Sequence, residues 1–169
     1  YYYAKSCDTK CLTVNIPKGP KLSYHTSQTA VIIFNLLNYS SITDIALDKN
    51  PSILKKYDKV ILLHNEYVTK KEFAAITKHP NVVYLFPNAL YAEVKTDYTK
   101  NTMTLVRGHG YPSTDISNGF GWKFDNSKLE YDYECKDWKF VKIGNGKMLN
   151  CYPYYRLLYD SALLKEIVK

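Results

Sequence analysis

The alternation of strand and helix that decides the fold lies in residues 59–86, KVILLHNEYVTKKEFAAITKHPNVVYLF. Its first and last parts, residues 59–63 and 81–86, are apolar runs with the length and composition of buried strands. Between them, Thr69 and Glu72 have capping-box spacing, which predicts a helix that begins after Thr69 and ends before Pro80. Strand, helix and strand in this order predict a parallel sheet of the α/β class.

The sequence before this stretch extends the same pattern. Residues 29–37 are apolar and rich in β-branched side chains, which predicts a central strand. Residues 41–57 are expected to form a loop followed by a short helix. The predicted fold is therefore α/β, with a doubly wound, mostly parallel sheet.

The sequence after this stretch favours β structure. Residues 91–95 and 102–107 predict a hairpin, residues 119–123 continue the β-rich pattern, and residues 161–168 predict a closing helix. At 169 residues the chain fits one domain. We expect that single domain, 1–169, to consist of an N-terminal extension (1–28), an α/β core (29–107) and a β-rich half that ends in the helix (108–169).

The four cysteines favour an oxidising compartment. Cys135 and Cys151 flank a predicted hairpin that turns at residues 144–146, so a disulfide between them is geometrically natural. Cys7 and Cys11 are four residues apart and are expected to close a small loop, although four cysteines allow three connectivities. A zinc site is the alternative, but the cysteines lack the paired short spacing of a zinc ribbon.

Other sequence features also favour an extracellular or cell-surface location. Asn38 begins a glycosylation sequon, and the chain starts without Met, which is expected of a protein trimmed of its leader. No apolar run is long enough to span a bilayer.

Composition bears on the partners. The formal charge is +7, but the lysines are interspersed with acidic residues, which indicates a solvated surface and argues against nucleic-acid binding. Tyrosine is over-represented, with 17 residues, and such amphipathic rings are enriched at interfaces. A homo-oligomer or a surface protein partner is therefore expected, although ordinary packing also explains the tyrosines.

Polar side chains follow the predicted strands. His64, Glu66 and Tyr67 come after the first run, and Tyr91 comes shortly after the second. Because open α/β sheets bind ligands at the carboxyl ends of their strands, we expect one shared crevice there, with His64 and Glu66 as candidate catalytic residues. His109, between two glycines, belongs to a loop that is able to reach over this crevice. The alternative is that these side chains only form structural hydrogen bonds.

Two motifs, His64-Asn65-Glu66-Tyr67 and Asn88-Ala89-Leu90-Tyr91, follow strands in the same order as in a known family. Together with the preceding Thr43–Asp58 segment, they resemble the C-terminal domain of the N,N-dimethylformamidase large subunit over about residues 30–107. That domain has a glutamine-amidotransferase-like fold, which the resemblance implies for this chain.

The resemblance implies an iron site and amide hydrolysis, because the family binds one iron through two tyrosines and a glutamate. By motif, the tyrosine ligands correspond to Tyr67 and Tyr91. The glutamate lies later in the family, and the candidates here are Glu130 and Glu134. Phenolate becomes a good ligand at neutral pH when a hard Lewis-acidic ion displaces its proton, since its free pKa is about 10.

The chain also departs from the family pattern. The family has Trp after each tyrosine, where this chain has Val68 and Ala92, and Glu93 replaces the Arg of the second motif. The large N-terminal region of the amidase is also absent from this sequence. A cysteine-dependent amidotransferase is not expected, because no cysteine lies between positions 11 and 135 to act as its nucleophile.

Two functions are consistent with these observations. The first is an exported, non-catalytic binding or assembly module that keeps an amidase-like fold. The second is a mononuclear iron-dependent amidohydrolase acting on a small carboxamide.

Overall fold

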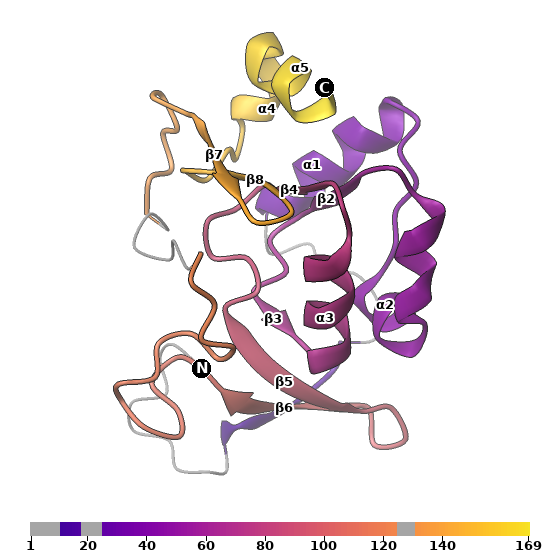
Figure 1. The fold of residues 1–169 in the computed structure, drawn as a ribbon, viewed down its shortest axis with the longest axis vertical. Helices are drawn as coiled ribbons and strands as arrows, with labels where there is room; N and C mark the ends of the chain where they lie inside the picture. The colour runs from indigo at the N-terminus through magenta and orange to yellow at the C-terminus, as the bar shows by residue number, and fades with distance from the viewer. Residues whose placement is uncertain (1–10, 18–24, 125–130) are drawn as a thin grey trace.

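The computed structural model describes residues 11–17, 25–124 and 131–169, and these form a mixed α/β fold with two four-stranded mixed sheets (Figure 1). The first sheet contains, in spatial order, β1 (Thr13–Asn15), β6 (Thr102–Arg107), β5 (Ala92–Asp97) and β3 (Tyr67–Val68). The second contains β2 (Val60–Leu62), β4 (Val82–Tyr84), β8 (Gly146–Leu149) and β7 (Phe140–Ile143). Strands β3 and β5 pair in parallel, as do β2 with β4 and β4 with β8, and the remaining pairs are antiparallel.

This arrangement confirms the α/β class but differs from the single, mostly parallel sheet expected from the sequence. The chain leaves the second sheet after β2 and enters the first as β3, and it does so again between β4 and β5. The antiparallel β5–β6 hairpin then extends the first sheet away from the helices (Figure 1).

Helices cover both faces of the second sheet. On one face lie α1 (His25–Leu36), α4 (Arg156–Tyr159) and α5 (Ser161–Val168), and on the other α2 (Asp44–Lys49), the 3-10 helix η2 (Pro51–Lys56) and α3 (Lys70–Lys78). Because successive side chains of a strand point to opposite faces, Val83 joins the cluster around Phe34, whereas Val82 joins the one around Ile76.

The prediction of a central strand at residues 29–37 is wrong, because most of this segment belongs to α1. Ala30 and Phe34, four residues apart, are buried in the core, while Ile32 and Leu36 are 52% and 78% exposed. This spacing places the buried pair on one face of a helix. The high apolar content of the other face concealed the helical period.

Several local predictions are confirmed. Thr69 and Glu72 form both hydrogen bonds of a capping box at the start of α3. The hairpin at residues 91–107 is β5–β6, and the closing helix is α5. The additional β structure expected at residues 119–123 is wrong, because these residues form turns and loop.

The Cys135–Cys151 disulfide is present, with the two Cα atoms 5.3 Å apart. It joins the two segments that flank the β7–β8 hairpin, and both cysteines are buried in one cluster with side chains of α4 and α5. The second expected pair includes Cys7, which lies outside the described residues.

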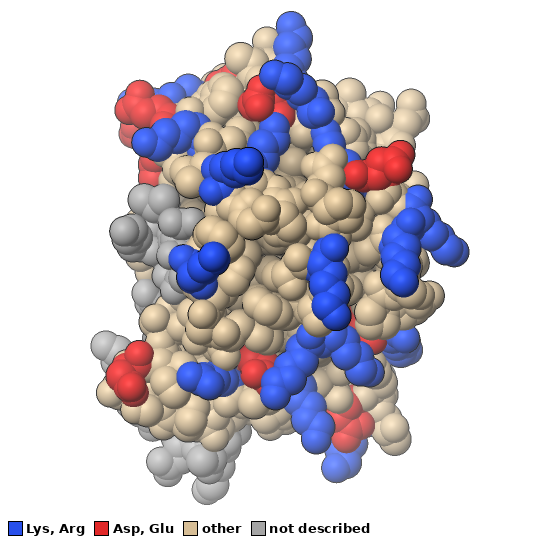
Figure 2. Space-filling model, in the orientation of Figure 1, with Lys and Arg blue, Asp and Glu red and all other residues tan. Residues whose placement is uncertain are grey.

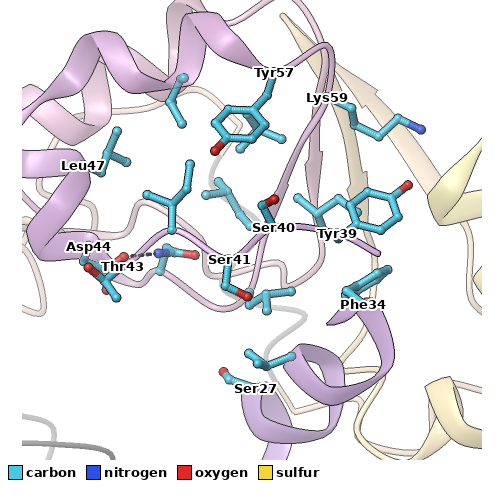
Figure 3. Close-up of a pocket in the computed structure, with 18 residues that line it drawn as sticks. Ser27, Phe34, Tyr39, Ser40, Ser41, Thr43, Asp44, Leu47, Tyr57 and Lys59 are labelled. Carbon is cyan, nitrogen blue, oxygen red and sulfur yellow. Dashed lines mark hydrogen bonds between the residues drawn. The ribbon is translucent and has the colours of Figure 1, made fainter. Parts of the chain in front are cut away.

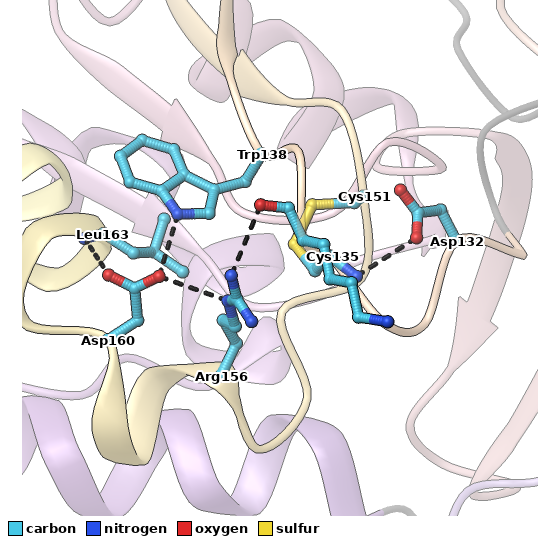
Figure 4. A network of polar contacts seen from close by, with 8 residues as sticks. Asp132, Cys135, Trp138, Cys151, Arg156, Asp160 and Leu163 are labelled. Atoms are coloured by element: carbon cyan, nitrogen blue, oxygen red, sulfur yellow. Dashed lines mark hydrogen bonds and ion pairs between the residues drawn. A yellow bond between two sulfur atoms is a disulfide. The ribbon is translucent and has the colours of Figure 1, made fainter.

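Beside the disulfide, Asp160 joins three elements (Figure 4). Its carboxylate accepts hydrogen bonds from the Trp138 indole (2.9 Å), from Arg156 Nε (3.1 Å) and from the Leu163 backbone N–H (2.9 Å), which caps α5. The hydrogen bond from the Leu163 N–H is the largest of the interactions that lower the pKa of Asp160 below its ordinary value.

The surface charges are dispersed. On the face drawn in Figure 2, lysine and arginine side chains are scattered around an uncharged centre, with acidic side chains between them. In the part of the chain that the structure describes, no helix has the length and apolar character needed to cross a membrane.

Candidate functional site

The candidate site lies where the chain passes from the second sheet into the first. β2 continues through residues 63–66 into β3, and β4 continues through residues 85–91 into β5. The two connections remain paired, because the N–H groups of Tyr91 and of the residue after it donate to the Glu66 carbonyl oxygen at 3.0 and 2.9 Å. The two sequence motifs therefore meet at the carboxyl ends of parallel strands, where α/β folds place their ligands.

The backbone of this region adopts an uncommon conformation. Positive φ angles occur at His64 (80°), Asn65 (29°) and Leu90 (59°). His109 also has a positive φ angle (54°), and its loop is distant in sequence but close in space. Residues other than glycine rarely adopt such angles, least of all a bulky residue such as leucine. Strained backbone of this kind clusters at functional sites, because the surrounding structure has to hold it in place.

A carboxylate lies between two imidazoles at this junction. Glu66 Oε1 is 2.8 Å from His109 Nε2, and Glu66 Oε2 is 3.6 Å from His64 Nε2. The His109 side chain is 5% exposed, that of Glu66 15% and that of His64 23%. The group is thus mostly shielded from water, which strengthens its electrostatic interactions.

The two predicted tyrosines flank the same imidazole. The Tyr67 ring stacks on the His109 ring with centroids 5.2 Å apart, and the Tyr91 ring meets it edge-on at 4.5 Å. The structure therefore brings Glu66, Tyr67 and Tyr91 together around His109. The sequence-based expectation that the His109 loop reaches the strand ends agrees with this geometry.

The loop of residues 108–119 holds His109 in place. The Gly119 N–H donates to the Tyr91 carbonyl oxygen at 2.7 Å. A Cβ atom at Gly119 would lie 2.4 Å from the Arg107 carbonyl oxygen, so no larger residue fits without moving the backbone. No sequence pattern singled out this glycine, because the contact that requires it joins segments that are far apart in the chain.

His64 lies in a different environment. Its ring packs near those of Phe86 (5.0 Å) and Tyr152 (5.8 Å), and the Asn88 amide nitrogen is 3.1 Å from Nε2. Burial lowers the pKa of His64, although the nearby Glu66 opposes this effect. A neutral ring can accept a hydrogen bond from the Asn88 amide. The sequence did not predict a role for Asn88, although Asn88 begins the second motif, Asn88-Ala89-Leu90-Tyr91.

The other predicted site residues lie elsewhere. Glu134, a candidate third iron ligand, forms an ion pair with Lys136 at 2.6 Å, and both side chains are largely exposed. The other candidate, Glu130, lies outside the described residues. Asn38 of the glycosylation sequon is exposed just after α1. Glu66 lies close to both tyrosines, because its carboxylate and the two tyrosine rings all contact His109.

The chemistry of the donor set fits a hard metal ion. Among the described residues, no group of three or more His, Cys, Asp and Glu side chains is arranged to hold a metal. A metal at this junction would therefore need tyrosine ligands, and Tyr67 and Tyr91 lie beside Glu66 and His109. Phenolate and carboxylate oxygens are hard donors, which suits a hard metal ion such as iron.

Comparison with protein-family models gives no match for this chain, and neither does comparison with curated proteins.

Proposed function

We propose that Glu66, His109, Tyr67 and Tyr91 form a metal-dependent centre that hydrolyses a small carboxamide. The observation that carries the proposal is the position of His109, whose ring lies between the two tyrosines and whose Nε2 is 2.8 Å from Glu66. Packing alone does not require a carboxylate, an imidazole and two phenols at one strand end. The proposal also retains the amidotransferase-like scaffold that the sequence resemblance implies.

Each residue has a distinct role in this proposal. Glu66 lies 2.8 Å from His109 Nε2 and would orient the ring, and His109 would act as the base that takes a proton from water. Tyr67, Tyr91 and Glu66 would supply the metal ligands. A bound iron would act as a Lewis acid that polarises the amide carbonyl.

The first test is the metal content of protein purified without chelators. We expect close to one iron per chain, a visible tyrosinate-to-iron absorption band and slow hydrolysis of N,N-dimethylformamide or acetamide. A Tyr67→Phe, Tyr91→Phe double variant keeps both rings but removes both hydroxyls, so it should lose the iron, the band and the activity together.

Two further variants make this test specific. A Tyr131→Phe, Tyr133→Phe variant removes two hydroxyls from exposed rings and should retain the metal. His109→Gln should keep the iron but lower kcat roughly 10²- to 10⁴-fold, as expected for the loss of a general base. Absence of metal from wild-type protein, even after anaerobic loading with Fe²⁺, would refute the proposal.

A second candidate is the exported binding or assembly module, which a surface feature favours. Tyr131, Tyr133, Tyr155 and Tyr159 are 58%, 48%, 57% and 69% exposed. Exposed aromatic side chains of this kind are enriched at protein interfaces. Light scattering after gel filtration would support this candidate if it shows a defined oligomer that dissociates when Tyr155 and Tyr159 are replaced by serine.

A further inference from the structure

A cavity of about 400 Å³ lies beside β2 and is separate from the Glu66–His109 pair (Figure 3). It is lined by residues 60–63 along the strand, by residues 39–44 across from it, and by side chains of α1, α2 and η2. Its volume is in the range of sites that bind small molecules or a few residues of peptide.

One edge of β2 is available to a ligand in this cavity. β2 is the terminal strand of its sheet, and β4 pairs with its other edge. The Val60 N–H donates to Asn81 O (3.0 Å), and Leu62 O accepts from the Leu85 N–H (3.1 Å). Because the bonding groups of a strand alternate in direction, the N–H and C=O of Ile61 point away from β4, toward the free edge.

A negative charge lies at the carboxyl end of this edge. Asp44 lines the cavity, and its Oδ1 accepts a hydrogen bond of 2.6 Å from Asn65, which follows β2 closely in the chain (Figure 3). A ligand cation at this position would form a charge-assisted hydrogen bond with the carboxylate.

The opposite end of the cavity is bordered by a positive charge. Lys59 precedes β2, and its ammonium group donates to the Val168 carbonyl oxygen at 2.6 Å. The two charges therefore lie at opposite ends of β2. Because the Lys59 ammonium group is turned toward the Val168 carbonyl oxygen and away from the cavity (Figure 3), the charge that a ligand meets in the cavity is that of Asp44, which favours a ligand with a cationic end.

The walls between these ends are apolar on both sides of the strand edge. Val31 and Phe34 of α1 line one side, and Leu47, Leu54 and Tyr57 line the other. Successive side chains of an extended peptide point in opposite directions, so each wall would receive alternate side chains. The cavity therefore favours apolar side chains on both faces of its ligand.

We propose that this cavity binds a short, extended apolar peptide with a free amino terminus. The peptide lies antiparallel to β2, exchanges hydrogen bonds with the Ile61 backbone and places its ammonium group at Asp44. The antiparallel direction follows because the amino end of the peptide meets the carboxyl end of β2. Addition of a strand to an exposed sheet edge is a common mode of peptide recognition. The proposal does not depend on the hydrolytic centre, because it concerns binding alone.

Calorimetric titration with the tripeptide Leu-Val-Leu tests the proposal. We expect binding of the free peptide, and a loss of at least tenfold in affinity when its amino terminus is acetylated. Asp44→Asn should weaken binding of the free peptide to the level of the acetylated one. Asp58→Asn is the matched control, because Asp58 is exposed and does not line this cavity.

Amide hydrogen exchange locates the bound peptide. The Ile61 amide should exchange more slowly when the peptide is present, while the Val60 amide, already bonded to Asn81, should change little. Circular dichroism establishes that the Asp44→Asn variant is folded. Equal affinity for the free and acetylated peptides, no binding at millimolar concentration, or unchanged exchange at Ile61 would each overturn the proposal.

Discussion

At the scale of single residues, Gly146 is a position where the fold tolerates no side chain. It pairs with Val82 in the parallel β4–β8 ladder, and a Cβ atom there would lie 1.9 Å from the Val82 carbonyl oxygen. We expect Gly146→Ala to lower the free energy of unfolding by about 3 kcal/mol, because the two strands have to separate. Urea denaturation measures this change.

Gly144 in the same hairpin is the matched control. A Cβ atom at Gly144 would meet only the Phe124 ring, at 3.3 Å, and that side chain is able to move. Gly144→Ala should therefore change the free energy of unfolding by less than about 1 kcal/mol. Equal destabilisation by the two substitutions would contradict the explanation based on the β4–β8 contact.

The residues of the candidate site were predictable only in part. Tyr67 and Tyr91 each follow an apolar run, so their proximity could be inferred from the rule that ligands bind at strand ends. The proximity of Glu66 and His109 could not be inferred from the sequence, because it depends on where the loop of residues 108–119 packs. The positive φ angle of Leu90 also has no sequence signal, since leucine seldom adopts that conformation.

At the scale of elements, predictions succeeded where the signal is local. α3 carries its own capping box, and the β7–β8 hairpin is bounded by the disulfide and by turn residues. The prediction failed at α1, where six apolar residues obscure whether the period is that of a helix or of a strand. The division into two sheets arises from the breaks after β2 and β4, which depend on tertiary contacts.

The junction of α4, α5 and the hairpin offers a test at this scale. Asp160→Ala removes the cap of α5 and the acceptor for both Trp138 and Arg156. We expect a loss of about 2 to 3 kcal/mol in the free energy of unfolding, measured by urea denaturation. Asp160→Asn keeps an oxygen for the cap and should cost less than half as much. If the two variants lose the same stability, the ion pair with Arg156 matters more than the cap.

At the scale of the whole molecule, we expect stability to fall as pH rises toward neutrality. Burial is the main cause that raises the pKa of Glu72 from 4.5 to about 7, with repulsion from Asp44 and Asp48 adding to it and hydrogen bonds from Thr69 opposing it. Because the folded state holds the proton more tightly than the unfolded state, the contribution of Glu72 is complete below pH 4.5 and is lost as pH rises through about 7. That difference in pKa corresponds to about 3 kcal/mol.

Glu72→Gln separates this effect from all other titrations. Glutamine still accepts the Thr69 N–H in the capping box but carries no proton to lose, so the decline in stability between pH 4.5 and about 7 should disappear. Glu166→Gln is the control, since neighbouring Lys147 lowers the pKa of that carboxyl and its titration ends below this range. Thermal unfolding at several pH values measures both profiles. An unchanged decline in the Glu72→Gln variant would show that another buried group, and not the capping-box carboxylate, links the fold to pH.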